Sequence, residues 1–408
     1  MPGRPLYAVA LPAGPALLDL LGAALDGGPA VLPIDPALPA PARHRLLAEL
    51  RPHTLVTDRG SVRLPGGEPA GDGVSVVIAT SGSTGSPKGV ELAASALKYS
   101  AAATLRRVDA RAGERWLCCL PPSAVGGLQV LIRSLLGDTE PVVLDGFSAE
   151  QVAAAPAQHL AVVPTQLRRL LDADVDLARF RTILVGGDAL PSDLLARAAA
   201  AGAPVVTTYG MTETSGGCVY DGRPLDGVEI DVIDDGRVRI GGPVLARGYR
   251  LRPDLTEAAL ADGWLTTQDL GRVTGDGRLE VLGRVDDVIV TGGVNVSATA
   301  IGELLATQAD VAAAAVVGVA DEEWGQRVVA VVVPKTEASP PNLAVLRAHV
   351  YARAAPALAP RELHLVDALP MLPSGKLDRP ALRQLALRQL ALRQQAIPQQ
   401  AVPQQATT

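Results

Sequence analysis

The chain has 408 residues, of which 48% are hydrophobic, and its formal charge at pH 7 is −6. This length and composition exclude a disordered chain and fit a globular protein with more than one domain. The net negative charge argues against a dense basic surface of the kind that binds nucleic acid, so no nucleic-acid partner is expected.

The cysteines and the apolar segments bear on the cellular compartment. Cys118, Cys119 and Cys218 are too few and too irregularly spaced for a disulfide framework, which favours a reducing compartment. No apolar stretch reaches the ~18 residues that a membrane span requires. The N-terminal segment lacks the small-residue cleavage site of an export signal. The sequence therefore predicts a cytoplasmic protein without a membrane span.

The first two thirds of the chain predict an α/β domain. Short β-branched runs alternate with segments of helical period that are rich in Ala, Leu and Arg, as in parallel strands joined by helices. The clearest runs lie at 74–80, 141–146, 159–164, 182–187 and 203–210. Clusters of Gly, Ser and Thr follow several of these strands, where open α/β sheets bind their ligands.

One of these clusters, IATSGSTGSPKGVELA at 78–93, includes Lys88 and precedes a segment that reads as a helix start. Small residues let backbone N–H groups converge on a phosphate, and hydroxyl groups add further donors. The cluster is not a Walker P-loop, because Lys88 follows Pro87 and precedes Gly89. Alone, it is equally consistent with a flexible surface turn.

The remaining third of the chain has a different texture. From about residue 225, short polar strands with the turn signals DDG and GDG predict a small antiparallel or barrel-like β unit. Two strong strands within 312–334 and a helical segment at 342–354 predict a compact α+β domain. The expected organisation is a large domain over 1–283, a hinge over 284–287 and a small domain over 288–380.

The segment 381–408 is of low complexity. It repeats a five-residue unit, beginning ALRQL ALRQL ALRQQ and ending with Pro- and Gln-rich copies. This composition predicts a disordered tail, although the first half could form a short helix. Deletion of residues 383–408 is therefore expected to leave the melting temperature and turnover nearly unchanged.

Four further motifs accompany the loop at 78–93, in a fixed order along the chain. They are TTYGMTET at 207–214, TQDLG at 267–271, GRVDD at 283–287 and LPSGKLDR at 372–379. Together they resemble the adenylate-forming superfamily, which contains acyl-CoA synthetases, amino-acid adenylation domains and luciferases. The resemblance covers residues 74–380. It implies a large adenylate-forming domain with parallel sheets and a small β unit, followed by a small mobile α+β domain.

The resemblance implies a nucleotide site that binds ATP. In it, the loop from Thr80 to Gly89 is a mobile lid over the β- and γ-phosphates, and its glycines allow the lid to open and close. The residues implied in nucleotide binding are Thr80, Ser81, Gly82, Ser83, Thr84, Gly85, Lys88, Gly186, Gly187, Thr208, Tyr209, Gly210, Met211, Asp269 and Arg284.

Individual roles follow from the same resemblance. Tyr209 is expected to stack on adenine, whereas Asp269 and Arg284 reach the ribose. Thr212 reaches the α-phosphate, and Glu213 helps to hold Mg²⁺. One protein carboxylate suffices for this cation, because it takes further oxygen ligands from phosphates and water.

Two more residues are implied in the small domain and the hinge. Lys376 matches the catalytic lysine, whose ammonium group offsets negative charge while the substrate carboxylate attacks the α-phosphorus. A solvated surface lysine is the alternative reading. Asp286 matches the hinge, where a few backbone dihedrals absorb a large domain rotation between two half-reactions.

The acid is expected to bind the segment CCLPPSAVGGLQVLIRSLL at 118–136, through Ser123, Ala124, Gly126 and Gly127. This segment lacks the aspartate that pairs with an amino-acid ammonium group, which disfavours an α-amino acid. It resembles the o-succinylbenzoate-CoA ligases of menaquinone synthesis, although those usually have histidine where Ser123 and Ala124 stand. Arg133 could approach a second substrate carboxylate, but a surface position on a helix is expected.

The resemblance thus implies an AMP-forming acid–thiol ligase that uses ATP, Mg²⁺ and coenzyme A, with o-succinylbenzoate as the first candidate acid. Another aromatic or small acid, or a separate carrier protein as acceptor, remains open. A non-catalytic nucleotide-binding protein is the alternative of a different class. The protein is expected to be a monomer or a homodimer.

Overall fold

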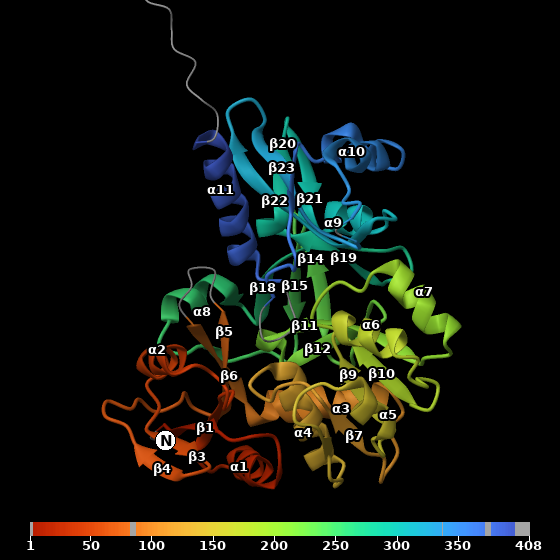
Figure 1. Ribbon diagram of the computed structural model, residues 1–408. Coiled ribbons are helices and arrows are strands. Elements are labelled where there is room, and N and C mark those ends of the chain that lie inside the picture. The colour runs from red at the N-terminus through yellow and green to blue at the C-terminus, as the bar shows by residue number, and fades with distance from the viewer. Residues whose placement is uncertain (1–2, 82–86, 337, 372–376, 396–408) are drawn as a thin grey trace, which may run out of the picture. The chain divides into compact units, whose positions relative to one another are not determined.

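A computed structural model describes residues 3–81, 87–336, 338–371 and 377–395. The chain divides into two compact units, Met1–Val281 and Leu282–Thr408. The first contains two seven-stranded sheets and a smaller antiparallel sheet, and the second contains a five-stranded sheet with helices (Figure 1). The predicted fold class, an α/β large domain with a β unit and a small α+β domain, is confirmed. Within the described part of the chain, no helix is both long enough and apolar enough to cross a bilayer.

The first seven-stranded sheet contains the strand before and the strand after the loop at 82–86. Its order is β16-β6-β5-β2-β1-β3-β4, in which β2, β1 and β3 pair in parallel. The strands are β1 (Leu6–Ala10), β2 (Ala30–Pro33), β3 (Thr54–Thr57), β4 (Gly60–Arg63), β5 (Val74–Ser81), β6 (Pro87–Ala93) and β16 (Gly248–Tyr249).

The second seven-stranded sheet has the order β13-β12-β11-β10-β9-β7-β8. Both β9 and β10 are buried at every position and pair in parallel, which explains why their sequences are continuous apolar runs. The strands are β7 (Trp116–Cys118), β8 (Val142–Val143), β9 (His159–Val162), β10 (Thr182–Val185), β11 (Val205–Met211), β12 (Gly216–Tyr220) and β13 (Arg223–Pro224).

Helices on the two sides of the second sheet have separate cores. Leu21 of α1, Leu97 of α3 and Leu128 of α4 share one buried cluster with strands of both seven-stranded sheets. Leu167 of α6 and Leu194 of α7 belong to a second cluster on β9 and β10. The helices of this unit are α1 (Pro15–Leu25), α2 (Ala40–Leu50), α3 (Ala94–Arg107), α4 (Val125–Leu136), α5 (Ala149–Ala154), α6 (Pro164–Asp172), α7 (Ser192–Ala200) and α8 (Pro253–Ala259).

The smaller antiparallel sheet forms the predicted β unit. Its strands are β14 (Glu229–Val232), β15 (Arg237–Gly241), β17 (Leu260–Ala261), β18 (Trp264–Val273) and β19 (Leu279–Arg284). Two short 3₁₀ helices, η1 (Thr212–Thr214) and η2 (Val285–Asp287), follow β11 and β19. Strand β19 contains the boundary between the two units, close to the predicted limit at residue 283.

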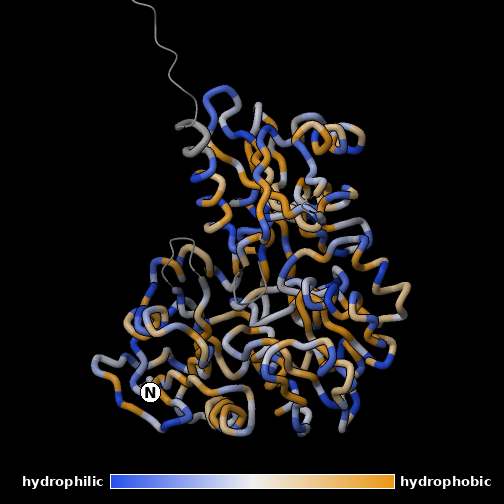
Figure 2. Tube along the Cα trace, in the orientation of Figure 1, coloured by the Kyte–Doolittle hydropathy of each residue, from blue (hydrophilic) through white to orange (hydrophobic). Residues whose placement is uncertain are grey.

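The second unit is a sheet with the order β21-β20-β23-β22, extended by β24 beside β23. Hydrophobic residues are frequent along its strands in Figure 2, in keeping with the apolar sequences of β22 and β23. Its elements are β20 (Val288–Thr291), β21 (Val294–Ser297), α9 (Ala298–Ala306), β22 (Val311–Asp321), β23 (Gly325–Pro334), α10 (Leu343–Tyr351), η3 (Pro356–Leu358), β24 (Glu362–Leu365) and α11 (Arg379–Gln395).

Helix α11 confirms that the first half of the tail forms a helix and contradicts disorder as far as Gln395. The repeat is helical as far as Gln395. Residues 396–408, for which disorder is also predicted, lie outside the described residues. Leu382 packs with Ala315 and Val331, and Ala386 packs with Val319 and Val329. Both α11 side chains are fully buried because the sheet supplies an apolar face that the repeat alone does not reveal. Deletion of residues 383–408 would remove the buried Ala386, so we no longer expect it to leave the melting temperature unchanged.

We expect Leu382→Ala to lower the free energy of unfolding by about 2–5 kcal/mol, because it leaves a cavity under α11. The matched control is Leu387→Ala on the same helix, where the side chain is 47% exposed and the change should stay within about 0.5 kcal/mol. Urea unfolding of both variants measures the difference. Equal effects would show that α11 does not pack on the sheet.

Candidate active site

Strands β5 and β6, on either side of residues 82–86, form an antiparallel pair that we call the β5–β6 hairpin. Strands β5 and β6 pair with Thr80 opposite Lys88, and the Thr80 hydroxyl donates to the Lys88 carbonyl at 3.4 Å. The predicted helix start after residues 82–86 is wrong: strand β6 comes first, because these residues pair with β5, and helix α3 begins only at Ala94. Gly82, Ser83, Thr84 and Gly85 lie outside the described residues. The backbone of Ser81 ends β5.

Tyr209 and Asp269, which are far apart in the sequence, meet in the structure. The Tyr209 hydroxyl donates to Asp269 Oδ2 at 2.8 Å. The backbone N–H of Asp269 donates to Thr267 Oγ1 at 3.0 Å, and this hydrogen bond fixes the backbone at Asp269. Burial, and then the charge of Asp269, raise the pKa of the Tyr209 phenol, so the hydroxyl keeps its proton. Two residues predicted in one nucleotide site are therefore neighbours.

Gly186 and Gly210 are required by close backbone and side-chain approaches. A Cβ atom on Gly186 would lie 2.1 Å from Thr208 Oγ1, and one on Gly210 would lie 2.2 Å from the Gly216 carbonyl oxygen. Thr208 Oγ1 also donates to the Val185 carbonyl at 3.3 Å. The ends of β10 and β11 thus approach more closely than residues with side chains would permit. Gly187 has a φ of +89°, a left-handed conformation that favours glycine.

Strand β11 ends at Met211, and η1 follows it directly. Thr212 begins η1, and Glu213 is its second residue. The two residues therefore lie just after the end of the strand. Oε1 of the Glu213 carboxylate accepts a 2.7 Å hydrogen bond from the Tyr249 hydroxyl. Lys88 Nζ lies 5.9 Å from the centroid of the Tyr249 ring. Burial, followed by the charge of Glu213, raises the pKa of Tyr249. Tyr249 therefore joins two predicted site residues.

Sequence reasoning missed Tyr249. Its signal was the GYR segment at 248–250, where Gly248 would place a Cβ atom 2.6 Å from a Thr256 methyl group. Neither Gly248 nor Tyr249 lies near a recognised phosphate-binding motif in the sequence. Tyr249 reaches the site only because β16 pairs with β6, opposite Val90.

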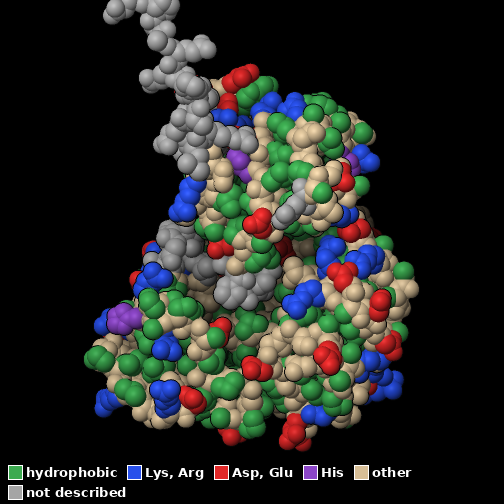
Figure 3. Space-filling view, in the orientation of Figure 1, with side chains coloured by type: hydrophobic (Ala, Val, Ile, Leu, Met, Phe, Trp, Pro, Cys, Tyr) green, Lys and Arg blue, Asp and Glu red, His purple; other side chains and the backbone are tan. Residues whose placement is uncertain are grey.

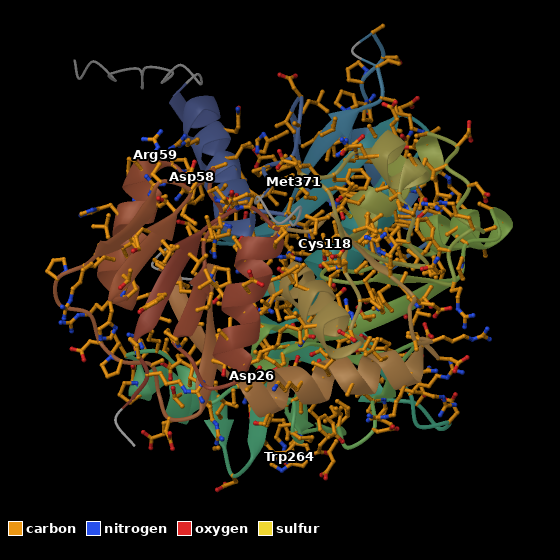
Figure 4. All side chains as sticks on the ribbon, turned by 90° about the horizontal axis from the view of Figure 1, so that it is seen from below. Asp26, Asp58, Arg59, Cys118, Trp264 and Met371 are labelled. Atoms are coloured by element: carbon orange, nitrogen blue, oxygen red, sulfur yellow. The ribbon has the colours of Figure 1, made fainter. Side chains whose placement is uncertain are left out.

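The predicted acid segment forms a turn and the start of α4. The backbone N–H of Ala124 donates to the Pro121 carbonyl at 3.0 Å, and Ser123 is partly exposed in the same turn. A Cβ atom on Gly127 would lie 2.4 Å from the Pro121 carbonyl oxygen, whereas one on Gly126 would meet the end of Leu120 at 3.3 Å. The glycines therefore let α4 begin close against the strand-to-helix turn. Cys118, at the end of β7 before this turn, lies in the interior (Figure 4).

Arg133 is not on the surface, so that expectation is wrong. Arg133 is only 5% exposed, and its guanidinium group lies 4.2 Å from the centroid of the Trp116 ring. His159 stacks on the same Trp116 with a centroid distance of 4.6 Å. Helix α4 belongs to the cluster that both seven-stranded sheets share, so both faces of the helix are covered. Arg133 thus packs in the core.

The second unit contains the remaining predicted residues. Arg284 ends β19, and Asp286 lies in η2. Next to it, the Asp287 carboxylate is bound by the Arg379 guanidinium group and by the Thr299 hydroxyl. Arg379 begins α11, shortly after the segment 372–376. Lys376 lies outside the described residues. Met371 and Leu377, which stand on either side of residues 372–376, form an antiparallel β-bridge.

The described residues contain no group of three or more His, Cys, Asp and Glu side chains that could hold a metal ion. Glu213 therefore offers a single carboxylate with an oxygen ligand of the kind that Mg²⁺ prefers, and the other ligands would come from phosphates and water. The residues present fit a cation that arrives with its nucleotide. On the face shown in Figure 3, acidic and basic side chains are interspersed.

The β5–β6 hairpin, the contact between Tyr209 and Asp269, and the division into a large and a small unit agree with the resemblance to adenylate-forming enzymes. The family model for AMP-binding enzymes matches residues 61–250, and that for their C-terminal domain matches residues 300–376. The chain therefore belongs to the AMP-binding enzyme family, which confirms the resemblance inferred from the motifs.

Individual relatives agree with this assignment. A probable 2-succinylbenzoate–CoA ligase of Mycobacterium tuberculosis is 42% identical over 395 residues, which cover 92% of this chain and 97% of that protein. The o-succinylbenzoate CoA synthetase from Bacillus subtilis, solved with its acyl-adenylate intermediate, aligns with a TM-score of 0.84 and 26% identity, over 94% of this chain and 89% of that one. Another structure of that synthetase, with ATP and magnesium, has a TM-score of 0.83 and 25% identity, with coverages of 94% and 90%.

We expect Gly210→Ala to lower the melting temperature and to weaken ATP binding, because the new methyl group would displace backbone between β11 and β12. Overpacking of this kind costs about 1–3 kcal/mol. Gly22→Ala on α1 is the control, since a Cβ atom there meets no atom within 4 Å. Differential scanning fluorimetry and ATP titration measure both variants. Unchanged ATP affinity in Gly210→Ala would contradict the placement of β11 in the nucleotide site.

Proposed function

We propose that this protein is an ATP-dependent 2-succinylbenzoate–CoA ligase. The observation that carries the proposal is the 42% identity to a probable ligase of this kind, which extends over 97% of that relative and so includes both units. The enzyme is an AMP-forming acid–thiol ligase with ATP, Mg²⁺ and coenzyme A. As the motifs imply, its product serves menaquinone synthesis.

The reaction has two half-reactions. In the first, a carboxylate oxygen of the acid attacks the α-phosphorus of ATP, and the bond to pyrophosphate breaks, which gives acyl-AMP. In the second, the sulfur of coenzyme A attacks the acyl carbon, and AMP leaves with the electrons of the broken C–O bond. The thiol proton is released to the surroundings.

The residues of the large unit bind and orient the nucleotide. Tyr209, near the end of β11, stacks on adenine, and Gly186, Gly187 and Gly210 belong to the same nucleotide site. Asp269, held by its contacts to Tyr209 and Thr267, accepts hydrogen bonds from the ribose hydroxyl groups, and the Arg284 guanidinium group donates to the ribose. Thr212 contacts the α-phosphate, and Thr80, Ser81 and Lys88 carry the hairpin over the outer phosphates.

Glu213 supplies the protein ligand of the cation. Bound Mg²⁺ would offset charge on the phosphate oxygens, which lowers the repulsion that the incoming carboxylate meets. Lys376 of the small unit adds a second positive charge toward the reacting carboxylate. Asp286 in η2 is the hinge that lets the small unit change orientation between the half-reactions.

The acid binds against the turn before α4, where Ser123, Ala124, Gly126 and Gly127 lie. Side chains here are small, and no histidine stands at Ser123 or Ala124, where the resembling ligases have one. Free coenzyme A is the acceptor, as the names of the CoA ligases that the chain resembles indicate. A separate carrier protein is the second candidate acceptor.

Two further properties belong to the same proposal. The protein acts in the cytoplasm, in keeping with three free cysteines that are all buried. It acts as a monomer or a homodimer, which light scattering after size-exclusion chromatography measures directly.

We expect 2-succinylbenzoate to give the highest kcat/KM in a panel with benzoate, other aromatic acids, malonate and fatty acids. The assay measures pyrophosphate release with ATP and Mg²⁺, and thioester formation with coenzyme A. Faster turnover of fatty acids would refute the assignment of the acid. No pyrophosphate with any acid, despite ATP binding, would favour a non-catalytic nucleotide-binding protein.

We expect Lys376→Ala to slow acyl-AMP formation by ~10²- to 10³-fold, because a preorganised charge is lost from the phosphoryl transition state. Thioester formation from synthetic acyl-AMP and coenzyme A should stay close to wild type. Lys335→Ala is the matched control, since this exposed lysine lies in the same unit. If both half-reactions of Lys376→Ala slow equally, the lysine is structural or shared between the steps.

A further inference from the structure

The segment Ala246–Arg250 bridges the β5–β6 hairpin and the η1 turn. On one side, the backbone N–H of Ala246 donates to the Glu213 carbonyl at 2.8 Å. On the other side, the N–H groups of Arg247 and Arg250 donate to the carbonyls of Glu91 and Gly89 at 2.8 and 2.7 Å. The segment is therefore fixed to β6 and to η1 at once.

Arg250 holds the end of this segment in place. Its side chain is almost fully buried and donates to the Leu50 carbonyl at 2.6 Å, to the Pro69 carbonyl at 2.9 Å and to Glu91 Oε1 at 3.3 Å. Because a buried guanidinium group that lost these acceptors would be costly, the arrangement is rigid. The backbone of the adjacent Tyr249 is therefore fixed independently of its side chain.

The Tyr249 side chain reaches both neighbours of the segment. Its hydroxyl donates to Glu213 Oε1 at 2.7 Å, and its ring lies 5.9 Å from Lys88 Nζ, which is within the range of a cation–π contact. The hydrogen bond occupies one oxygen of the carboxylate and restricts its rotation. The second oxygen is then left to serve as the metal ligand.

We infer that Tyr249 is a positioning residue for the metal carboxylate: its hydroxyl orients Glu213 toward the cation that arrives with ATP, and its ring steadies Lys88. This inference rests on the proposed function, because it takes Glu213 as the ligand of Mg²⁺. Tyr249 itself touches neither substrate nor metal. Hydrogen bonds to metal ligands of this kind change metal affinity by ~10- to 100-fold.

The test compares Tyr249→Phe, which removes only the hydroxyl group, with Tyr249→Leu, which also removes the ring. Tyr99→Phe is the matched control, because the Tyr99 hydroxyl donates to the Asp226 carbonyl in the same unit and Tyr99 is not among the proposed site residues. Each protein is titrated with Mg²⁺ at saturating ATP. The binding readout is the rise in melting temperature caused by Mg²⁺, and the kinetic readout is pyrophosphate release.

We expect Tyr249→Phe to need ~10- to 100-fold more Mg²⁺ in both readouts, while its stabilisation by ATP without Mg²⁺ and its KM for the acid stay near wild type. Tyr249→Leu should weaken ATP binding as well, through Lys88. Tyr99→Phe should match wild type throughout.

A wild-type Mg²⁺ requirement in a folded Tyr249→Phe protein would overturn the inference, as would a uniform fall in kcat with the Mg²⁺ requirement unchanged. If wild-type protein gains no stability from Mg²⁺ with ATP, Glu213 holds no cation and the inference fails. If Mg²⁺ stabilises the wild-type protein but no acid gives thioester, the proposed function fails while the thermal titration still decides the role of Tyr249.

Discussion

The conformation of the η1 turn, which carries Glu213, depends on the carbonyl group of Ser215, the residue that follows η1. Ser215 is fully buried with a φ of +54°, and its carbonyl oxygen accepts hydrogen bonds from Ser100 Oγ at 3.1 Å and from Gln129 Nε2 at 2.7 Å. Its own hydroxyl donates to the Val244 carbonyl at 2.8 Å. A buried polar group without a partner costs about 1–3 kcal/mol, so these bonds favour one conformation of the turn. Glu213 stands two residues before this point.

The same hydrogen bonds connect the parts of the site that serve different substrates. Ser100 belongs to α3, which follows the β5–β6 hairpin, and Gln129 belongs to α4, which begins at the acid segment. Val244 precedes the segment that carries Tyr249. The η1 turn, helix α4 and the segment that carries Tyr249 therefore share one buried support. A substitution in the core at this point would disturb all of them together.

Much of this arrangement could be predicted from the sequence where a residue acts through its immediate neighbours. The apolar runs of β9 and β10 mark buried parallel strands, and the motifs containing Tyr209 and Asp269 predict one nucleotide site, in which these side chains are in contact. Features that depend on distant pairing could not be predicted. Tyr249 reaches Glu213 through the pairing of β16 with β6, and Arg133 is buried because α4 packs between two sheets.

The local sequence pattern also gave wrong predictions of secondary structure where it suited more than one kind of element. The residues after the phosphate loop suit a helix or a strand, and pairing with β5 decides for the strand. In the tail, a period of five residues fits no helical stripe, yet two of its side chains meet an apolar sheet and the helix forms. The roles of Lys376 and Asp286 depend on chemistry between two half-reactions, which a single arrangement of the chain does not test.

Helix α11 has a consequence for how the gene can vary. Its repeating unit corresponds to whole codons, so the gain or loss of a copy preserves the reading frame. The fully buried side chains of α11, Leu382 and Ala386, come from the first two copies of the unit. Copies added after these would lengthen the C-terminus without altering that buried contact. The buried contact therefore depends on the first two copies, and a change in the number of later copies would leave it intact.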